Sequence, residues 1–243
     1  MNTGSSDFAS LYAPKDGYVF VVTYGRSGST LLQHLLNRIP GYCIRGENGD
    51  ALRPLFMSWK RLRKSPGPRP RAAPAGKGAT AVPTHPFYGM EHIDPYRYRL
   101  DLADTFVRQV LRLPAGTRVG GFKEIRYMAE PRSLASYLDF IATTFPQTRF
   151  VFNTRDHEAV CQSGWWKSQP RDEVLKMLAR GEAEFDRYIA SKPDRCLKLH
   201  YDTYVADHAE FARLFEFLGE TTDLDLVADV MGRQLTHLKT TAG

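Results

Sequence analysis

The sequence predicts a single α/β domain, residues 1–243, in which helices flank a central parallel sheet. Three observations favour this class. Short apolar runs typical of buried strands alternate with helical patterns of apolar residues along the chain. A tight turn, GRSGST, joins the first of these runs directly to a helix. With 243 residues, of which 42% are hydrophobic, the chain has the size of one domain with one sizeable core.

The first strand and helix are the clearest elements. Residues 18–23 form an aromatic and β-branched run that is hydrophobic on both faces, as a buried parallel strand requires. The stretch 29–38 has leucines at helical spacing, and Pro40 and Gly41 follow it as stop signals. These residues therefore form a strand, a tight turn and a helix.

The later elements repeat this alternation. Further strands are expected within 117–127, at 149–155 and at 196–201, and further helices at about 97–112, 133–145, 156–168, 171–190 and 208–220. Ligands of open parallel sheets bind at the carboxyl ends of the strands. The informative loops are therefore those after Thr23, Gly121 and Asn153.

Two segments lack such patterns. Residues 1–16 are polar and are expected to form a flexible N-terminus, and residues 63–86 are rich in proline and basic residues, as in an inserted flexible loop. No apolar run is long enough for a signal peptide or a transmembrane helix. A cytoplasmic protein is the expectation, although a fragment of something larger would give the same pattern.

The charge and the cysteines narrow the class of ligand. A formal net charge of +6 arises from 33 Lys and Arg against 27 Asp and Glu, which favours polyanionic ligands such as a nucleotide, a nucleic acid or an acidic surface. The three cysteines are far apart and have no CxxC spacing, so they support neither a disulfide framework nor a zinc site. We expect reduced thiols.

The turn after the first strand is suited to an anion. A helix N-terminus offers unpaired N–H groups and partial positive charge. Gly28 allows close approach of the backbone, and Ser27, Ser29 and Thr30 add hydroxyls. A Walker A loop requires Gly at position 23 and Lys at position 29, where this chain has Thr and Ser. An ATPase would therefore lack its phosphate lysine, and there is no obvious need for Mg²⁺.

The segment TYGRSGSTLL resembles the 5′-phosphosulfate loop of sulfotransferases that use 3′-phosphoadenosine 5′-phosphosulfate (PAPS), in which a basic residue stands at the position of Arg26. The 3′-phosphate signature of that family is similar to FVFNTR followed by DHEAVCQS, with Arg155 ending a strand and Ser163 eight residues later. A third similarity is the late strand and turn with Tyr201 and Asp202. GRSGSTLL is closer to carbohydrate and bacterial members than to the cytosolic phenol type.

The resemblance implies a P-loop NTPase-like sulfotransferase fold, sulfuryl transfer from PAPS to an acceptor hydroxyl, and adenosine 3′,5′-bisphosphate as product, with no metal. It assigns donor binding to Arg26, Ser27, Gly28, Ser29, Thr30, Leu31, Arg155, Ser163 and Tyr201. The basic glycine-rich segment near the C-terminus of cytosolic members is missing. Arg233 and Lys239 are the available substitutes.

The resemblance also suggests a catalytic base. Some bacterial sulfotransferases place a catalytic Glu in a Gly-Glu pair soon after the loop helix, and Glu47 fits that position. A solvated loop acid is the alternative, Asp50 follows nearby, and His85 and His92 are rival bases.

Three further groups are candidates for the site. Lys123 and Arg126 flank Glu124 at a strand end, so one of them is expected to face the site while the other pairs with Glu124. Lys123 is the choice for catalysis, together with Arg26. Trp165 and Trp166 are each suited either to stacking on adenine or a sugar ring or to the core.

The acceptor is expected to bind near residues 48–100, whose aromatic and polar side chains suit a carbohydrate, a glycolipid or another small molecule, and a phenol nearly as well. Two rival functions stay open. A P-loop kinase shares the fold but needs the missing lysine, and a nucleic-acid-binding module is suggested by the pI of about 9.2. No nucleic-acid partner is expected, and the sequence leaves the oligomeric state open.

Overall fold

The computed structural model of the chain describes residues 7–65 and 83–240, with side chains up to residue 232. Within these residues the strands form one parallel sheet in the order β2-β3-β1-β4-β5. The strands are β1 (Tyr18–Val22), β2 (Tyr42–Arg45), β3 (Val119–Glu124), β4 (Arg149–Thr154) and β5 (Cys196–His200). Because β1 lies between β3 and β4, the order of winding reverses at its carboxyl end, where open sheets of this kind bind ligands.

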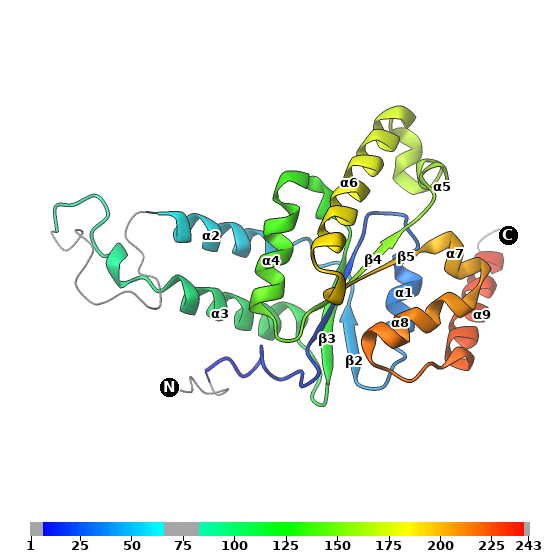
Figure 1. The fold of residues 1–243 in the computed structure, drawn as a ribbon, viewed down its shortest axis with the longest axis horizontal. Helices are drawn as coiled ribbons and strands as arrows, with labels where there is room; N and C mark the ends of the chain where they lie inside the picture. The colour runs from blue at the N-terminus through cyan, green and yellow to red at the C-terminus, as the bar shows by residue number, and fades with distance from the viewer. Residues whose placement is uncertain (1–6, 66–82, 241–243) are drawn as a thin grey trace.

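Helices connect the strands and cover both faces of the sheet (Figure 1). They are α1 (Ser29–Leu36), α2 (Leu52–Lys64), α3 (Pro95–Phe106), α4 (Leu134–Thr144), α5 (His157–Cys161), α6 (Arg171–Ser191), α7 (Tyr201–Ala206), α8 (Phe211–Leu218) and α9 (Leu224–Thr240). A π-helical turn, Val107–Leu111, extends α3, and short 3₁₀ turns join several of the other elements.

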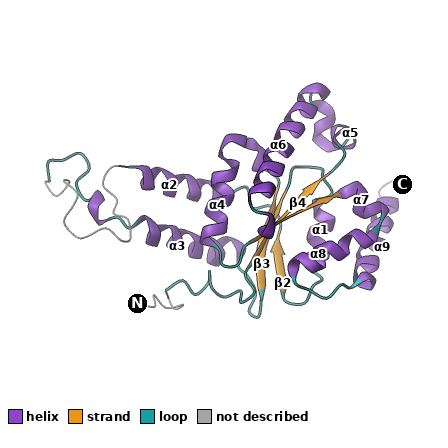
Figure 2. Cartoon of the chain, viewed as in Figure 1, coloured by secondary structure: helices purple, strands orange, loops and turns teal. Residues whose placement is uncertain are grey.

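The side chains of β1 alternate between two cores. Phe20 and Val22 pack in one core with residues of α2, α3, α4 and α6, whereas Val19 and Val21 pack in the other with α1, α8 and α9. Figure 2 shows the strands between these two layers of helices. All five residues of β1 are buried, which explains why its sequence is apolar on both faces. The predicted α/β domain with a parallel sheet is confirmed.

Several elements escaped the sequence patterns. β2 has only four residues at the sheet edge, too few for a clear period, and the basic residues of α2 hid an apolar stripe that includes Leu52 and Phe56. The helix expected at 156–168 is divided into α5 and a 3₁₀ turn, since Gly164 has a positive φ of 56°. Tyr201, expected at a turn, begins α7.

The segments expected to be flexible are only partly described. Residues 66–82 of the proline-rich segment and residues 1–6 lie outside the described residues, whereas Arg63 and Lys64 belong to α2. Phe8 and Leu11 are buried in the core, although the sequence analysis placed them in the flexible N-terminus, and Tyr18 Oη donates a hydrogen bond of 2.9 Å to the Leu11 carbonyl. The three cysteines are free thiols.

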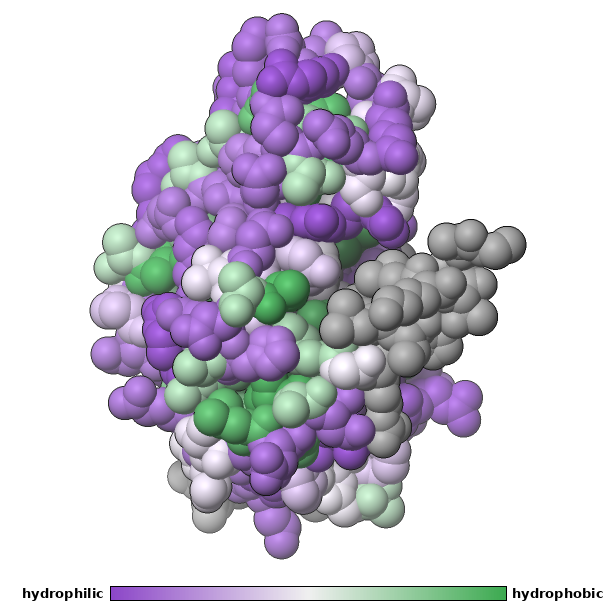
Figure 3. All heavy atoms as spheres, turned by 90° about the vertical axis from the view of Figure 1, so that its right-hand side faces the viewer, coloured by the Kyte–Doolittle hydropathy of each residue, from purple (hydrophilic) through white to green (hydrophobic). Residues whose placement is uncertain are grey.

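One face of the molecule, on the side of α9, is mainly hydrophilic, with hydrophobic residues in separate small groups (Figure 3). In the described part of the chain, no helix combines the length and apolar character needed to cross a membrane.

Candidate active site

A cleft of about 440 Å³ lies at the carboxyl ends of β1, β3 and β4. It brings together residues that are more than 170 positions apart in the sequence, and every residue assigned above to donor binding or catalysis lines it, except Ser27. The lining residues are Gly25, Arg26, Gly28, Ser29, Thr30, Leu31, Glu47, Lys123, Ile125, Arg155, Ser163, Trp165 and Tyr201.

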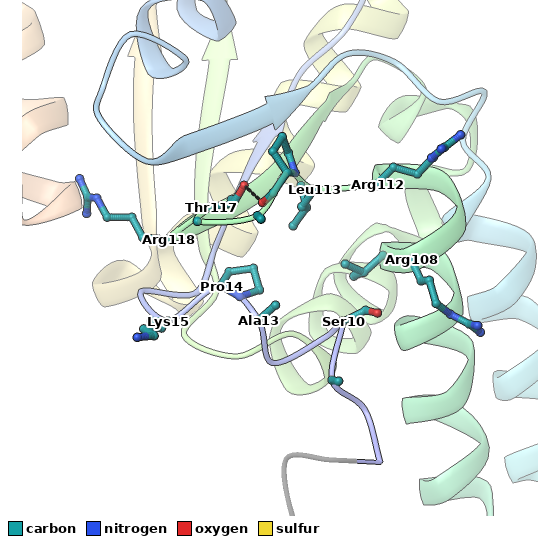
Figure 4. Close-up of a pocket in the computed structure, with 14 residues that line it drawn as sticks. Ser10, Ala13, Pro14, Lys15, Arg108, Arg112, Leu113, Thr117 and Arg118 are labelled. Atoms are coloured by element: carbon teal, nitrogen blue, oxygen red, sulfur yellow. Dashed lines mark hydrogen bonds between the residues drawn. The ribbon is translucent and has the colours of Figure 1, made fainter.

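A second cavity, of about 580 Å³, lies at the amino ends of β1 and β3, at the opposite end of the strands from the cleft (Figure 4). Its lining includes Pro14, Leu113 and Thr117, with Arg108 and Arg112 at its border. It contains none of the predicted site residues. The cleft at the carboxyl ends is therefore the candidate active site.

The loop between β1 and α1 lines the cleft and has an unusual backbone conformation. Gly28 has φ of 79° and Arg26 has φ of 68°, a conformation that non-glycine residues adopt at a cost. A Cβ on Gly28 would lie 2.0 Å from Tyr201 Cδ2, and one on Gly25 would lie 2.2 Å from a ring carbon of Trp165. These two positions therefore need glycine so that the loop and the aromatic rings can approach each other.

Ser27 has a structural role instead of lining the cleft. Its buried hydroxyl lies 2.6 Å from Thr23 Oγ1, and its carbonyl accepts a hydrogen bond of 2.8 Å from Asn153 Nδ2. Tyr204 Oη donates to Asn153 Oδ1 at 2.9 Å. A network of buried polar groups from β4 and α7 thus holds the loop in shape, so Ser27 can reach a ligand only through its backbone.

Arg26, Arg155 and Ser163 meet at one wall of the cleft. Arg26 Nε donates to Ser163 Oγ at 2.9 Å, and Arg155 Nη1 donates to the Arg26 carbonyl at 3.1 Å. The Arg155 guanidinium lies 4.7 Å from the ring centroid of Tyr201, and its Nε is 3.9 Å from Asp202. That Nε is buried and makes no hydrogen bond with a described residue, which leaves a donor for a ligand.

Tyr24 fixes the backbone of Arg155, a role that the sequence analysis missed. Its hydroxyl accepts a hydrogen bond of 2.8 Å from Arg155 N and lies 2.6 Å from Glu182 Oε1. Burial and the nearby Glu182 raise the pKa of Tyr24, so the hydroxyl stays protonated and donates to the carboxylate. Only the contact between the loop after β1 and α6 could have revealed this pair.

Opposite this wall, Lys123 and Glu47 form an ion pair of 2.6 Å. The Lys123 side chain is 7% exposed, and that of Glu47 is 36% exposed. Arg126 pairs with Glu124 at 3.2 Å. Lys123 thus lines the cleft while Arg126 pairs with Glu124, and a role of Lys123 in catalysis stays a prediction.

The remaining candidates divide between the cleft and other parts of the fold. Trp165 lines the cleft and is 52% exposed, whereas Trp166 packs against the core and donates a hydrogen bond to the Gly25 carbonyl. His85 and His92 are exposed and do not line the cleft. Asp50 is half-buried and pairs with Arg53 instead of facing the site.

The C-terminal basic residues and the absence of a metal can be followed only within the described residues. Arg233 and Lys239 lie in the part of α9 whose side chains are not described. Among the described residues, no three His, Cys, Asp or Glu side chains are grouped to hold a metal ion.

Comparison with known proteins gives a family match and a match in fold. A family profile described as "Sulfotransferase family" matches residues 18–223. The solved sulfotransferase STF9 from Mycobacterium avium shares the fold at a TM-score of 0.50 and 13% identity, over 96% of this chain and 71% of that one. The sulfotransferase domain from the curacin biosynthetic pathway has a TM-score of 0.49 and 15% identity, over 86% of this chain and 76% of that one. STF1 from Mycobacterium tuberculosis H37Rv has a TM-score of 0.49 and 16% identity, over 93% of this chain and 73% of that one. No curated protein sequence matches. Since the profile covers most of the chain, this protein belongs to the sulfotransferase family.

Proposed function

We propose that the enzyme transfers a sulfuryl group from PAPS to the hydroxyl of an acceptor, with adenosine 3′,5′-bisphosphate as the second product. One observation carries this proposal. Two guanidinium groups and a helix N-terminus line the same cleft as a Lys-Glu ion pair. The first set suits an anionic donor, and the second suits proton transfer at the acceptor.

The residues present fit such a donor. Arg155 has a buried Nε without a hydrogen-bond partner among the described residues, and Gly25 and Gly28 let the rings of Trp165 and Tyr201 pack closely against the loop. We propose that Arg155 and Ser163 hold the 3′-phosphate, and that Arg26 with the N–H groups of residues 27–31 holds the phosphosulfate. Trp165 offers an exposed ring for the adenine.

The chemistry then depends on Glu47 and Lys123. When bound, the donor supplies a sulfuryl group on a phosphate leaving group. Glu47 accepts the proton of the acceptor hydroxyl through Oε2, which makes no hydrogen bond with a described residue, while Oε1 stays on Lys123. Lys123 and Arg26 place positive charge where negative charge grows during transfer, and such preorganised donors are worth about 3 to 4 kcal/mol each.

The acceptor enters from the side of the cleft that Glu47 borders. Carbohydrates, glycolipids and other small molecules are the acceptor classes we propose. We place the reaction in the cytoplasm, in keeping with three cysteines that form no disulfide.

Transfer of labelled sulfate from PAPS to a panel of glycan, lipid and phenol acceptors tests the activity. Calorimetry with adenosine 3′,5′-bisphosphate tests the donor site without any acceptor, and we expect binding that needs no Mg²⁺. Lack of binding at tens of micromolar would overturn the choice of donor. Binding of ATP that depends on Mg²⁺ would instead favour a kinase.

A further inference from the structure

Glu124, at the end of β3, is buried beside the proposed catalytic pair. Lys123 and Glu124 are consecutive in the strand, so their side chains point to opposite faces. Lys123 reaches Glu47 in the cleft, whereas Glu124 is 1% exposed behind it. A buried carboxylate is costly unless several donors satisfy it.

Four donors satisfy the Glu124 carboxylate, and they come from two loops. Oε2 accepts from the backbone N–H groups of Asn48 and Asp50 at 3.3 and 2.9 Å. Oε1 accepts from Ile125 N at 2.8 Å and from Arg126 Nη1 at 3.2 Å. One carboxylate therefore joins the loop that follows β2 to the end of β3.

Glu47 directly precedes the residues that Glu124 holds. The following turn is unusual, since Gly49 and Asp50 both have positive φ, of 73° and 58°. For Asp50 this conformation costs energy, so surrounding contacts must maintain it. The hydrogen bonds to Glu124 supply such contacts on both sides of Gly49.

Arg53 reinforces the same connection. Its Nε donates to Asp50 Oδ2 at 2.5 Å, and its Nη2 donates to the Arg126 carbonyl at 3.2 Å. The guanidinium is buried over the Tyr137 ring, 4.6 Å from the centroid. Two groups, a carboxylate and a guanidinium, thus bridge residues 48–50 and 125–126.

We infer that Glu124 is a positioning residue for sulfuryl transfer: it holds residues 48–50 so that the Glu47 carboxylate stays against Lys123 and toward the acceptor. The inference rests on the proposed role of Glu47. It assigns no contact with donor or acceptor to Glu124 itself.

The test compares Glu124→Gln in the wild-type background and in a Glu47→Gln background. Gln keeps the shape but has only one acceptor oxygen. That oxygen should stay on the charged Arg126 donor, which leaves the NH₂ group toward the loop N–H groups, from which it cannot accept. We expect kcat to fall about 10-fold to 100-fold in the wild type, the range for a displaced catalytic group, with unchanged KM for PAPS. In the Glu47→Gln background we expect no further fall, because the group being positioned is already lost. An equal fall in both backgrounds would overturn the inference.

Backbone amide hydrogen exchange gives a readout that needs neither ligand nor turnover. The N–H groups of Asn48 and Asp50 should exchange faster in Glu124→Gln than in the wild type, while those in β1 stay protected. Unchanged protection at residues 48 and 50 would contradict the proposed contacts. The Glu124→Gln variant should bind adenosine 3′,5′-bisphosphate as tightly as the wild type does. If the wild type itself does not bind this ligand, the proposed function fails, and the inference about Glu124 is not the cause.

If Glu124→Gln does not fold, Arg53→Lys carries the same test. Lys keeps the charge but cannot bond Asp50 and the Arg126 carbonyl together. A fall in kcat limited to the background with intact Glu47 supports the inference, and a fall in both backgrounds overturns it. Arg132→Lys is the matched control, because Arg132 is exposed and does not line the cleft.

Discussion

Lys123 Nζ lies 2.6 Å from Glu47 Oε1, and this ion pair joins the sheet interior to the loop after β2. Lys123 is almost fully buried, whereas more than a third of the Glu47 side chain is exposed. The pair is therefore asymmetric. The buried member is fixed by the strand, and the exposed carboxylate can meet a substrate that enters from solvent.

Replacing Glu47 by Gln should strongly reduce turnover and spare donor binding. The amide retains the shape but cannot accept a proton, so kcat should fall by about 100-fold or more, the usual contribution of a general base. Affinity for adenosine 3′,5′-bisphosphate, measured by calorimetry, should stay within error of the wild type. Retained turnover would remove Glu47 from the role of base.

Replacing Arg155 by Ala should weaken the binding of adenosine 3′,5′-bisphosphate. A charged hydrogen bond is worth about 1.5 to 3 kcal/mol, or about 10-fold to 150-fold in Kd. Arg180→Ala is a suitable control, because Arg180 is exposed on α6 and does not line the cleft. Equal affinities of the two variants would contradict a phosphate site at Arg155.

Replacing Gly28 by Ala should damage both the loop and the donor site. Gly116 offers a matched control, since it has φ of 81° and no atom within 4 Å of an added Cβ. Both substitutions pay about 1 to 2 kcal/mol for the left-handed backbone. Only the change at Gly28 adds a collision with Tyr201, so it should lower the melting temperature further and weaken adenosine 3′,5′-bisphosphate. Similar melting temperatures and affinities would show that the loop has room at this point.

Replacing Trp165 by Ala should weaken ligands that carry adenine. Stacking of a base on an aromatic ring is worth about 1 to 3 kcal/mol, which corresponds to about 5-fold to 150-fold in Kd. Inorganic pyrophosphate, which lacks a base, should bind the variant and the wild type equally well in calorimetry. If the variant binds adenosine 3′,5′-bisphosphate and pyrophosphate more weakly to the same extent, the ring shapes the loop and does not stack on adenine.

The Glu220 carboxylate should make stability depend on acid pH. The hydrogen bond from Arg118 lowers the pKa of Glu220 below its ordinary value of 4.5. A carboxylate whose folded-state pKa is lowered adds stability above its unfolded-state pKa, and that stability is lost as the pH falls through the folded-state value. At neutral pH the free energy of unfolding should therefore be larger for the wild type than for Glu220→Gln, and the difference should shrink as the pH falls. A difference that persists below the folded-state pKa would point to a packing effect.

Much of the fold was predictable because its elements are local and strongly patterned. The apolar run of β1, the leucines of α1 and the strands around Phe122 and Phe152 all follow from hydrophobic periods. β2 was missed because four residues at a sheet edge carry too short a pattern, and α2 because its basic residues resemble a solvated segment. Pairing with β3 and packing against α3 decide those two elements.

The sequence by itself determined the α/β class and the resemblance to sulfotransferases, and it predicted an anion-binding turn. Neighbouring residues in a short motif set the conformation of the turn and supply its hydrogen-bond donors. The turn could therefore be recognised before the fold was known. Only the tertiary structure decided that Ser27 supports the loop, that Trp165 and not Trp166 faces the cleft, and that Glu124 lies behind Lys123. These roles depend on contacts between segments tens of residues apart, and no local pattern records which segments the folded core brings together.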